Sequence, residues 1–291
     1  MTYYAKKTSF PQKIDRLLVW SLRGIAAIVG TIVLFIMVFL VVESNSALQN
    51  IGLLHFFSDA SWNPGQGLYN LTPMVMSTLL VVTGAIILAA PIGILSALFC
   101  HYYAPRPIAN FYRRLLELMA GIPGVVYGFW GLVVVVPWIN RLQPPGASLL
   151  AGILMLALLI VPTTALTADA SLAGVPQEYL QGAASLGLSR WGTIREIVLP
   201  VARSGLFTSI ILGTGRAIGE TMIVLMVCGN VVQFPNSLFD SIRTLPANIA
   251  LEMDFALGVH RSALFVSGLL LMGGSLILVL VAEAIAEKEI Y

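Results

Sequence analysis

The chain has 291 residues, of which 58% are hydrophobic and only 10% are charged. Soluble domains carry roughly 25% charged residues, so this composition excludes an ordinary water-soluble domain and predicts a protein that needs lipid as its solvent. The net charge of +2 gives no sign of the dense basic surface that nucleic acid requires, which excludes nucleic acid as a partner and leaves membrane lipid.

Six stretches are apolar enough to cross a bilayer core of about 30 Å, which a helix of about 20 residues spans. They are Ile25–Val42, Met74–Phe99, Leu118–Ile139, Leu149–Ala168, Leu206–Val227 and Ala263–Ala282. The sequence therefore predicts an all-α polytopic membrane protein with six transmembrane helices. No small-residue cleavage site follows the first stretch, so we interpret it as a retained membrane anchor.

The positions of the basic residues predict the orientation of these spans. The N-terminal arm, the loops after the second and fourth spans and the C-terminal tail hold all but four of the 16 Lys and Arg. Basic loops stay in the cytoplasm, so we expect both termini in the cytoplasm of a multi-pass protein of the cytoplasmic membrane. The predicted parts are an arm (1–24), a first helix (25–42), an external segment (43–72), a membrane core (71–284) and a tail (285–291).

One outer segment and one interrupted span have a distinctive composition. Residues 43–72 contain no Lys or Arg, and we expect short amphipathic helices and turns on the membrane surface there. In the third span, Pro123 interrupts the helix, and non-helical backbone at that depth must be covered by protein or water. The break at 122–128 is predicted to face a pathway, with the Tyr127 hydroxyl as a donor. The alternative is a kink that only fits the bundle.

Residues 175–200 form a moderately polar helix-turn-helix pattern between two apolar spans. Pro176 suits the first turn of a helix, Gly187 ends that helix, and Ser189 is a suitable cap for the next one. Such a compact knob docks into a groove of another protein through a few apolar anchors. The predicted docking residues are Gln181, Gly182, Ala183, Leu186, Gly187 and Trp191. The alternative is an amphipathic loop that lies on lipid headgroups.

The fifth span contains Arg216 and Glu220, four residues apart. Residues at this spacing share one helix face, so we expect the two charges to pair. A guanidinium also offers a fork of donors that matches an oxyanion, so Arg216, released by Glu220 and assisted by the Thr221 hydroxyl, is predicted to hold an anion in a substrate pathway. The alternative is a purely structural ion pair that locks the span to a neighbour.

The loop carries a resemblance to a known family. Gly187, nine residues and then Ile197-Val198-Leu199-Pro200 resemble the EAA motif of ABC importer permeases, in which this helix docks onto an ATPase subunit. Gln181 departs from that motif, which commonly has Glu there, and Gly182 replaces its Ala. The departure removes a charge and leaves the docking expectation in place.

Two further runs narrow the resemblance. GRAIGETMIVLMVCGN at 215–230 and IPGVVYGFWG at 122–131, with Trp62-Asn63-Pro64, are similar to phosphate importer permeases of the PstC type, apart from Gly124 where serine is expected. The resemblance implies a type I ABC importer permease fold, inorganic phosphate as substrate and transport by alternating access. It also implies a second permease of the PstA type, two ATPase subunits of the PstB type that bind ATP and Mg, and an external binding protein of the PstS type.

Other functions have less support in the sequence. Lysine is absent between Lys13 and Lys288, so the chain lacks the lysine of a phosphate-binding loop, and any ATP must bind to another subunit. Glu220 is the only carboxylate within a predicted span, no catalytic motif is present, and the three histidines lack metal-ligand spacing, so we expect no enzyme, no cofactor and no metal in this chain. The remaining alternatives are an importer of molybdate, tungstate or sulfate, and a secondary transporter with Glu220 as a proton relay.

Overall fold

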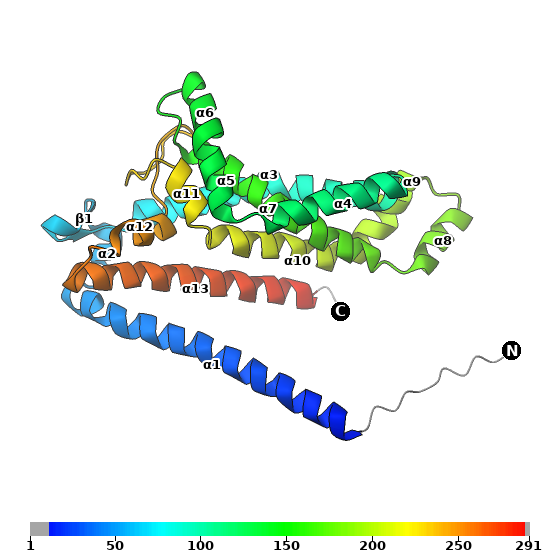
Figure 1. Cartoon of the computed structure of the whole chain (residues 1–291), viewed down its shortest axis with the longest axis horizontal. Helices are drawn as coiled ribbons and strands as arrows, with labels where there is room; N and C mark the ends of the chain where they lie inside the picture. Colours follow the sequence, from blue (N-terminus) through cyan, green and yellow to red (C-terminus); the bar gives the residue numbers. More distant parts are fainter. Residues whose placement is uncertain (1–11, 289–291) are drawn as a thin grey trace.

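The computed structural model describes residues 12–288, with side chains from 16 to 280, so residues 1–11 of the predicted arm and 289–291 of the predicted tail lie outside the described residues. The described part is a bundle of long helices that run along one common direction (Figure 1). The long helices are α1 (Gln12–Asn50), α3 (Thr72–Leu98), α7 (Leu149–Ala173), α10 (Leu199–Ile218) and α13 (Gly258–Lys288). Within residues 12–288, six helical segments have the length and composition to cross a membrane, which confirms the predicted number.

Helix α7 is the centre of the bundle, and α3, α4 (Arg106–Gly121) and α10 pack against it. Its apolar residues are buried on several sides, and the main core includes Leu156, Leu159 and Ile160. Helices α3 and α7 approach closely because Gly93 has no side chain: a Cβ there would lie 2.9 Å from the Thr164 Cβ. The helix runs past the predicted end at 168 to Ala173, which places Asp169 on it.

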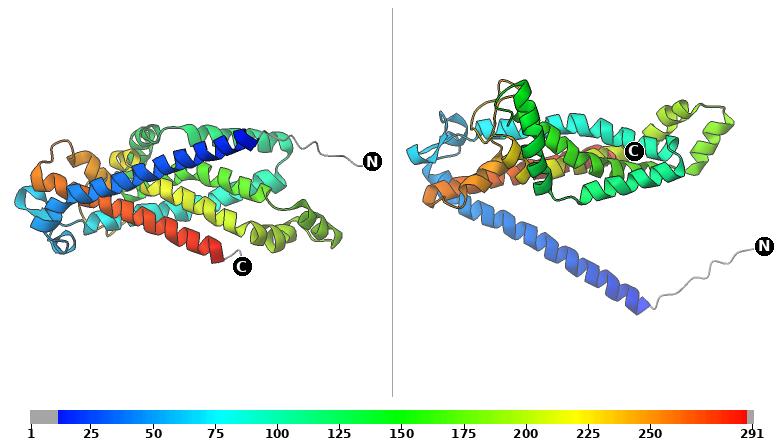
Figure 2. Two further views of the ribbon diagram at one scale, coloured as in Figure 1. Left: turned by 90° about the horizontal axis from the view of Figure 1, so that it is seen from below. Right: turned by 45° about the horizontal axis from the view of Figure 1, so that its top comes forward.

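Helix α1 is longer than its predicted span at both ends and stands apart from the bundle. It packs against α13 near its own C-terminal end, where the Ala47 backbone N–H donates to the Ser262 hydroxyl at 3.0 Å and the rings of Phe39 and Phe265 lie 5.6 Å apart. Towards its N-terminus it diverges from the other helices (Figures 1 and 2). Its exposed apolar side chains, such as Ile32 and Phe35, need lipid or a partner helix as cover.

The third and fifth spans differ from their predicted bounds because both contain a break. Helix α4 is amphipathic and ends at Gly121, and the extended Pro123 separates it from α5 (Gly124–Trp130). Helix α5 continues through the π-helical η3 (Gly131–Val135) into α6 (Val136–Leu142), so the candidate third span begins at Gly124. The fifth span begins earlier than predicted, and its helix α10 ends at Ile218 before a break and the short α11 (Met222–Val227).

The external segment folds into more than surface helices. After the turn α2 (His55–Ser58), strands β1 (Trp62–Asn63) and β2 (Leu68–Tyr69) form an antiparallel hairpin around η1 (Pro64–Gln66). The Trp62 indole N–H donates to Glu252 at the end of α12 (Leu245–Glu252), over 2.9 Å. The hairpin is therefore bound to the connection between α11 and α13 (Gly258–Lys288), which contains α12.

The remaining elements connect α3 to α4 and α7 to α10. The π-helical turn η2 (Phe99–Tyr103) extends α3. The segment between α7 and α10 contains α8 (Gln177–Ser185), α9 (Arg190–Thr193) and the π-helical η4 (Ile194–Val198). It projects from the end of the bundle opposite the hairpin (Figure 1).

Candidate functional site

The two broken spans meet at their breaks. A Cβ on Gly124, the first residue of α5, would lie 2.7 Å from a carboxylate oxygen of Glu220 in the other break. The same carboxylate accepts hydrogen bonds from the backbone N–H groups of Met222 and Ile223, at 3.1 and 3.2 Å, in the first turn of α11. Glu220 thus places its negative charge at the N-termini of two helices, where the peptide dipoles favour an anion.

The predicted ion pair between Arg216 and Glu220 is wrong in this structure. Helix α10 ends at Ile218, so Glu220 has left the helix and the four-residue spacing no longer places both side chains on one face. Arg216 donates to the Thr163 hydroxyl at 2.6 Å and to the Ala120 carbonyl at 3.4 Å. Among the described side chains, Arg216 donates only to neutral acceptors, and no carboxylate lies within ion-pair distance of it.

Tyr127 and Thr221 lie near this meeting point in different ways. The Tyr127 side chain is buried and its hydroxyl donates to the Met119 carbonyl at 3.0 Å, so it ties α5 to the end of α4. Its hydroxyl is therefore already used across the break, and the predicted free donor is not seen. Thr221 makes only a 3.4 Å contact to the Gly219 carbonyl and lines a cavity of about 480 Å³ against α12 and α13.

The connection between α7 and α10 together with the first two residues of α10, which we call the coupling loop (residues 175–200), has the predicted local form. Helix α8 begins at Gln177 after Pro176, and Gly187 adopts a left-handed conformation with φ of +70° that favours glycine. The Ser189 hydroxyl caps α9 by accepting from the Gly192 backbone N–H at 3.1 Å. Buried Ile194 fixes the loop to the end of the bundle.

The predicted docking residues separate into two groups. Leu186 and Trp191 are 81% and 58% exposed, and Gln181, Gly182 and Gly187 also lie on the surface. Ala183 is buried inside the loop, so its predicted contact with another protein is wrong: it faces the rest of the chain. Leu188 is exposed next to this surface, and the helical pattern did not reveal it because it follows the left-handed turn.

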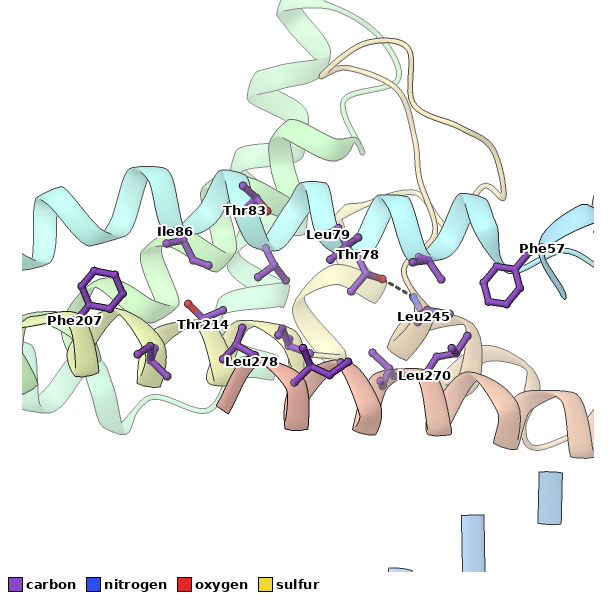
Figure 3. Close-up of a pocket in the computed structure, with 17 residues that line it drawn as sticks. Phe57, Thr78, Leu79, Thr83, Ile86, Phe207, Thr214, Leu245, Leu270 and Leu278 are labelled. Carbon is purple, nitrogen blue, oxygen red and sulfur yellow. Dashed lines mark hydrogen bonds between the residues drawn. The ribbon is translucent and has the colours of Figure 1, made fainter. Parts of the chain in front are cut away.

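An apolar cavity of about 630 Å³ lies between α3, α10, α12 and α13 (Figure 3). Its wall is mainly aliphatic and includes Leu79, Ile86, Leu270 and Leu278. The sequence did not predict it, because it arises from the relative placement of helices far apart in the chain.

Asp169 is a further charged residue that the sequence analysis did not select. It lies on α7, one residue beyond the predicted end of the fourth span, and accepts two hydrogen bonds from Arg113 of α4, at 2.7 and 2.9 Å. This hydrogen bonding to a carboxylate raises the pKa of the Arg113 guanidinium and keeps it charged. The spanning helix α7 therefore carries a carboxylate, whereas Glu220, the one carboxylate predicted within a span, lies in the break after α10.

At the outer end, Glu252 joins three segments. Besides Trp62, it accepts from Arg243 at 2.6 Å and lies 2.9 Å from the His260 ring nitrogen. The charge of Arg243 is thus balanced locally.

A coupling loop, two spans broken beside one partly buried guanidinium and six candidate spanning helices are the features of a transport permease. Residues 89–290 match the model of the family described as the binding-protein-dependent transport system inner membrane component. The chain belongs to this family, and it is an ABC transporter permease.

Curated relatives and solved structures agree with this class. The chain is 36% identical over 249 residues to the probable ABC transporter permease YqgH of Bacillus subtilis, covering 83% of this chain and 80% of that protein. It is 33% identical over 267 residues to the phosphate transport permease PstC of Haemophilus influenzae, covering 84% of each.

Two solved transporters share the fold. A chain of a bacterial alginate ABC transporter superposes with a TM-score of 0.67 at 14% identity, covering 95% of this chain and 96% of that chain. A chain of the inward-facing MetNI methionine ABC transporter gives a TM-score of 0.58 at 16% identity, covering 75% and 94%. The expected type I ABC importer permease fold is confirmed.

Proposed function

We propose that this chain is the PstC-type half of an ATP-driven importer of inorganic phosphate in the cytoplasmic membrane. The names of its PstC relatives in several bacteria support phosphate. The proposed partners are a second permease of the PstA type, two ATPase subunits of the PstB type that bind ATP and Mg, and an external PstS-type binding protein. Both termini would lie in the cytoplasm.

The observation that carries the proposal is the uncompensated charge of Arg216. Its two acceptors, the Thr163 hydroxyl and the Ala120 carbonyl, are neutral. An unpaired charge within a membrane costs about 2.5–3.5 kcal/mol even on mild scales. A phosphate that arrives supplies the missing negative charge and two oxygens at the spacing of the guanidinium fork. Arg216 therefore suits transient anion binding.

The proposed mechanism is alternating access. ATP binding closes the two ATPase subunits, and the coupling loop transmits that movement to α7 and α10. The pathway between the two permease chains then opens towards the binding protein, and Arg216 holds the anion while the breaks at 122–123 and 219–221 adjust. Loops and breaks are suited to such changes because a few residues at element ends absorb the backbone rotation.

Phosphate uptake into proteoliposomes that contain the complete importer tests the proposal. We expect Arg216→Ala to lower uptake about 10- to 100-fold, because a charge-assisted hydrogen bond contributes ~1.5–3 kcal/mol. Arg216→Lys retains the charge without the fork of donors, so its phosphate uptake should lie between those of the wild type and Arg216→Ala. Arg106→Ala, at an exposed position in α4, is the control and should leave phosphate uptake unchanged. Unchanged uptake in Arg216→Ala would contradict the assigned role.

The second candidate is the same machine with molybdate, tungstate or sulfate as substrate. The geometry of Arg216 favours this alternative as much as phosphate, because a guanidinium fork fits any tetrahedral oxyanion. Competition separates the two: unlabelled phosphate should suppress uptake of labelled phosphate, and equal concentrations of sulfate or molybdate should not. The secondary-transporter alternative is set aside by the family of the chain.

A further inference from the structure

A bidentate ion pair joins α4 to α7 away from Arg216. The Arg113 Nε donates to one oxygen of Asp169 at 2.7 Å and its Nη2 donates to the other at 2.9 Å. The two side chains are only 30% and 18% exposed, which limits solvent screening. The His101 Nδ1 also lies 3.5 Å from Asp169. Such a fork fixes both the distance and the relative orientation of two helices.

The same two helices supply both acceptors of Arg216. On α7, Thr163 precedes Asp169 by six residues, and on α4, Ala120 follows Arg113 by seven. At 1.5 Å per residue these separations are about 9 and 10.5 Å along the helices. Because each helix is stiff over this length, the ion pair at one end sets the separation of the two acceptors at the other.

The ion pair also lies beside the coupling loop. Helix α7 ends at Ala173, four residues after Asp169, and α8 begins at Gln177. Ala168 and Leu172 are buried in one cluster with Ile194 of the loop. A displacement of the loop therefore reaches the Asp169 segment of α7 before it reaches Arg216.

We propose that Asp169 and Arg113 are positioning residues that hold the Thr163 hydroxyl and the Ala120 carbonyl around Arg216 and transmit displacement of the coupling loop to the anion site. This inference rests on the proposed importer function. Without the ion pair, α7 moves with the loop and α4 does not follow, so ATP hydrolysis continues while the guanidinium is no longer repositioned.

The test measures ATP hydrolysis and phosphate uptake together, in proteoliposomes with the complete importer. For Asp169→Asn we expect retained hydrolysis and an about tenfold lower uptake per ATP, the scale of a charge-assisted pair. Arg113→Lys keeps one hydrogen bond to Asp169, so its uptake per ATP should lie between the values of the wild type and of Asp169→Asn. Arg114→Gln is the matched control, since it removes a charge from the exposed neighbouring position. The charge-exchanged double variant, Arg113→Asp with Asp169→Arg, should recover part of the wild-type ratio of phosphate uptake to ATP hydrolysis.

Each outcome decides the inference. An unchanged ratio in Asp169→Asn overturns it, and so does a parallel fall of hydrolysis and uptake in proportion to the assembled complex, because that is a purely structural effect. If Asp169→Asn does not assemble into the importer, the charge-exchanged double variant provides the test. Its failure to recover uptake per ATP overturns the inference. If the wild-type importer moves sulfate or molybdate and not phosphate, the proposed substrate fails, and the same ratio measured with that anion still tests the positioning role.

Discussion

Glu220 illustrates how the role of one residue depends on where its helix ends. Its carboxylate accepts from two backbone N–H groups of α11 and contacts the position of Gly124, so it connects the two breaks. A side chain that caps a helix in this way contributes about 0.5–2 kcal/mol. Arg216 is left to neutral partners, and the two charges have separate tasks: one stabilises the broken backbone and the other is available to an anion.

This separation predicts different effects for two substitutions of Glu220. Glu220→Gln keeps an oxygen that accepts from Met222 and Ile223, so phosphate uptake should stay within about fivefold of wild type, because only the helix-dipole contribution of ~0.3–1 kcal/mol is lost. Glu220→Leu removes the acceptor and should lower both uptake and thermal stability. Uptake assays and melting of the purified complex measure the two effects. Loss of uptake in Glu220→Gln would instead indicate that the charge itself is required.

At the scale of the elements, local signals predicted more than long-range ones. The coupling loop was predicted well, because Pro176, Gly187 and Ser189 determine helix ends through their own backbone preferences. The end of α10 was missed, since Gly219 interrupts a helix whose hydrophobic pattern continues into α11. The contact between Arg113 and Asp169 was missed because it joins residues 56 positions apart, which no local pattern encodes.

The exposed apolar surface of the coupling loop predicts an effect on assembly. Leu186→Asp places a charge at an 81% exposed apolar position, and an apolar anchor of a helix-in-groove contact does not tolerate this change. We expect the tagged variant to copurify with much less ATPase subunit than wild type in mild detergent. Leu257→Asp is the matched control, because Leu257 is 82% exposed and directly precedes α13 (Gly258–Lys288), which begins at the end of the bundle opposite the coupling loop (Figure 1). Equal recovery of the ATPase with both variants would contradict the docking role.

Along the length of the whole molecule, the coupling loop, the breaks beside Arg216 and the outer hairpin follow one another in that order. The coupling loop lies at one end of the bundle, the β1–β2 hairpin and α12 lie at the other, and the breaks beside Arg216 lie between them (Figure 1). The length of six spanning helices and the bias of Lys and Arg towards one end predicted this arrangement from the sequence. The divergence of α1 and the cavity between α3, α10 and α13 were not predicted, because both depend on how distant helices pack.

The proposed orientation of the bundle, with both termini in the cytoplasm, predicts the accessibility of single cysteines. Cys100 and Cys228 are buried, so the wild-type chain should react little with a membrane-impermeant maleimide and provides a low background. In cells with a sealed cytoplasmic membrane and a permeable outer envelope, Leu257→Cys should be labelled without further treatment, because it is exposed at the end that carries the hairpin. Leu186→Cys should be labelled only after the cytoplasmic membrane is permeabilised, if the coupling loop lies in the cytoplasm as the positive-inside rule predicts. Labelling of Leu186→Cys in sealed cells would reverse the orientation and, with it, the side from which an ATPase reaches the coupling loop.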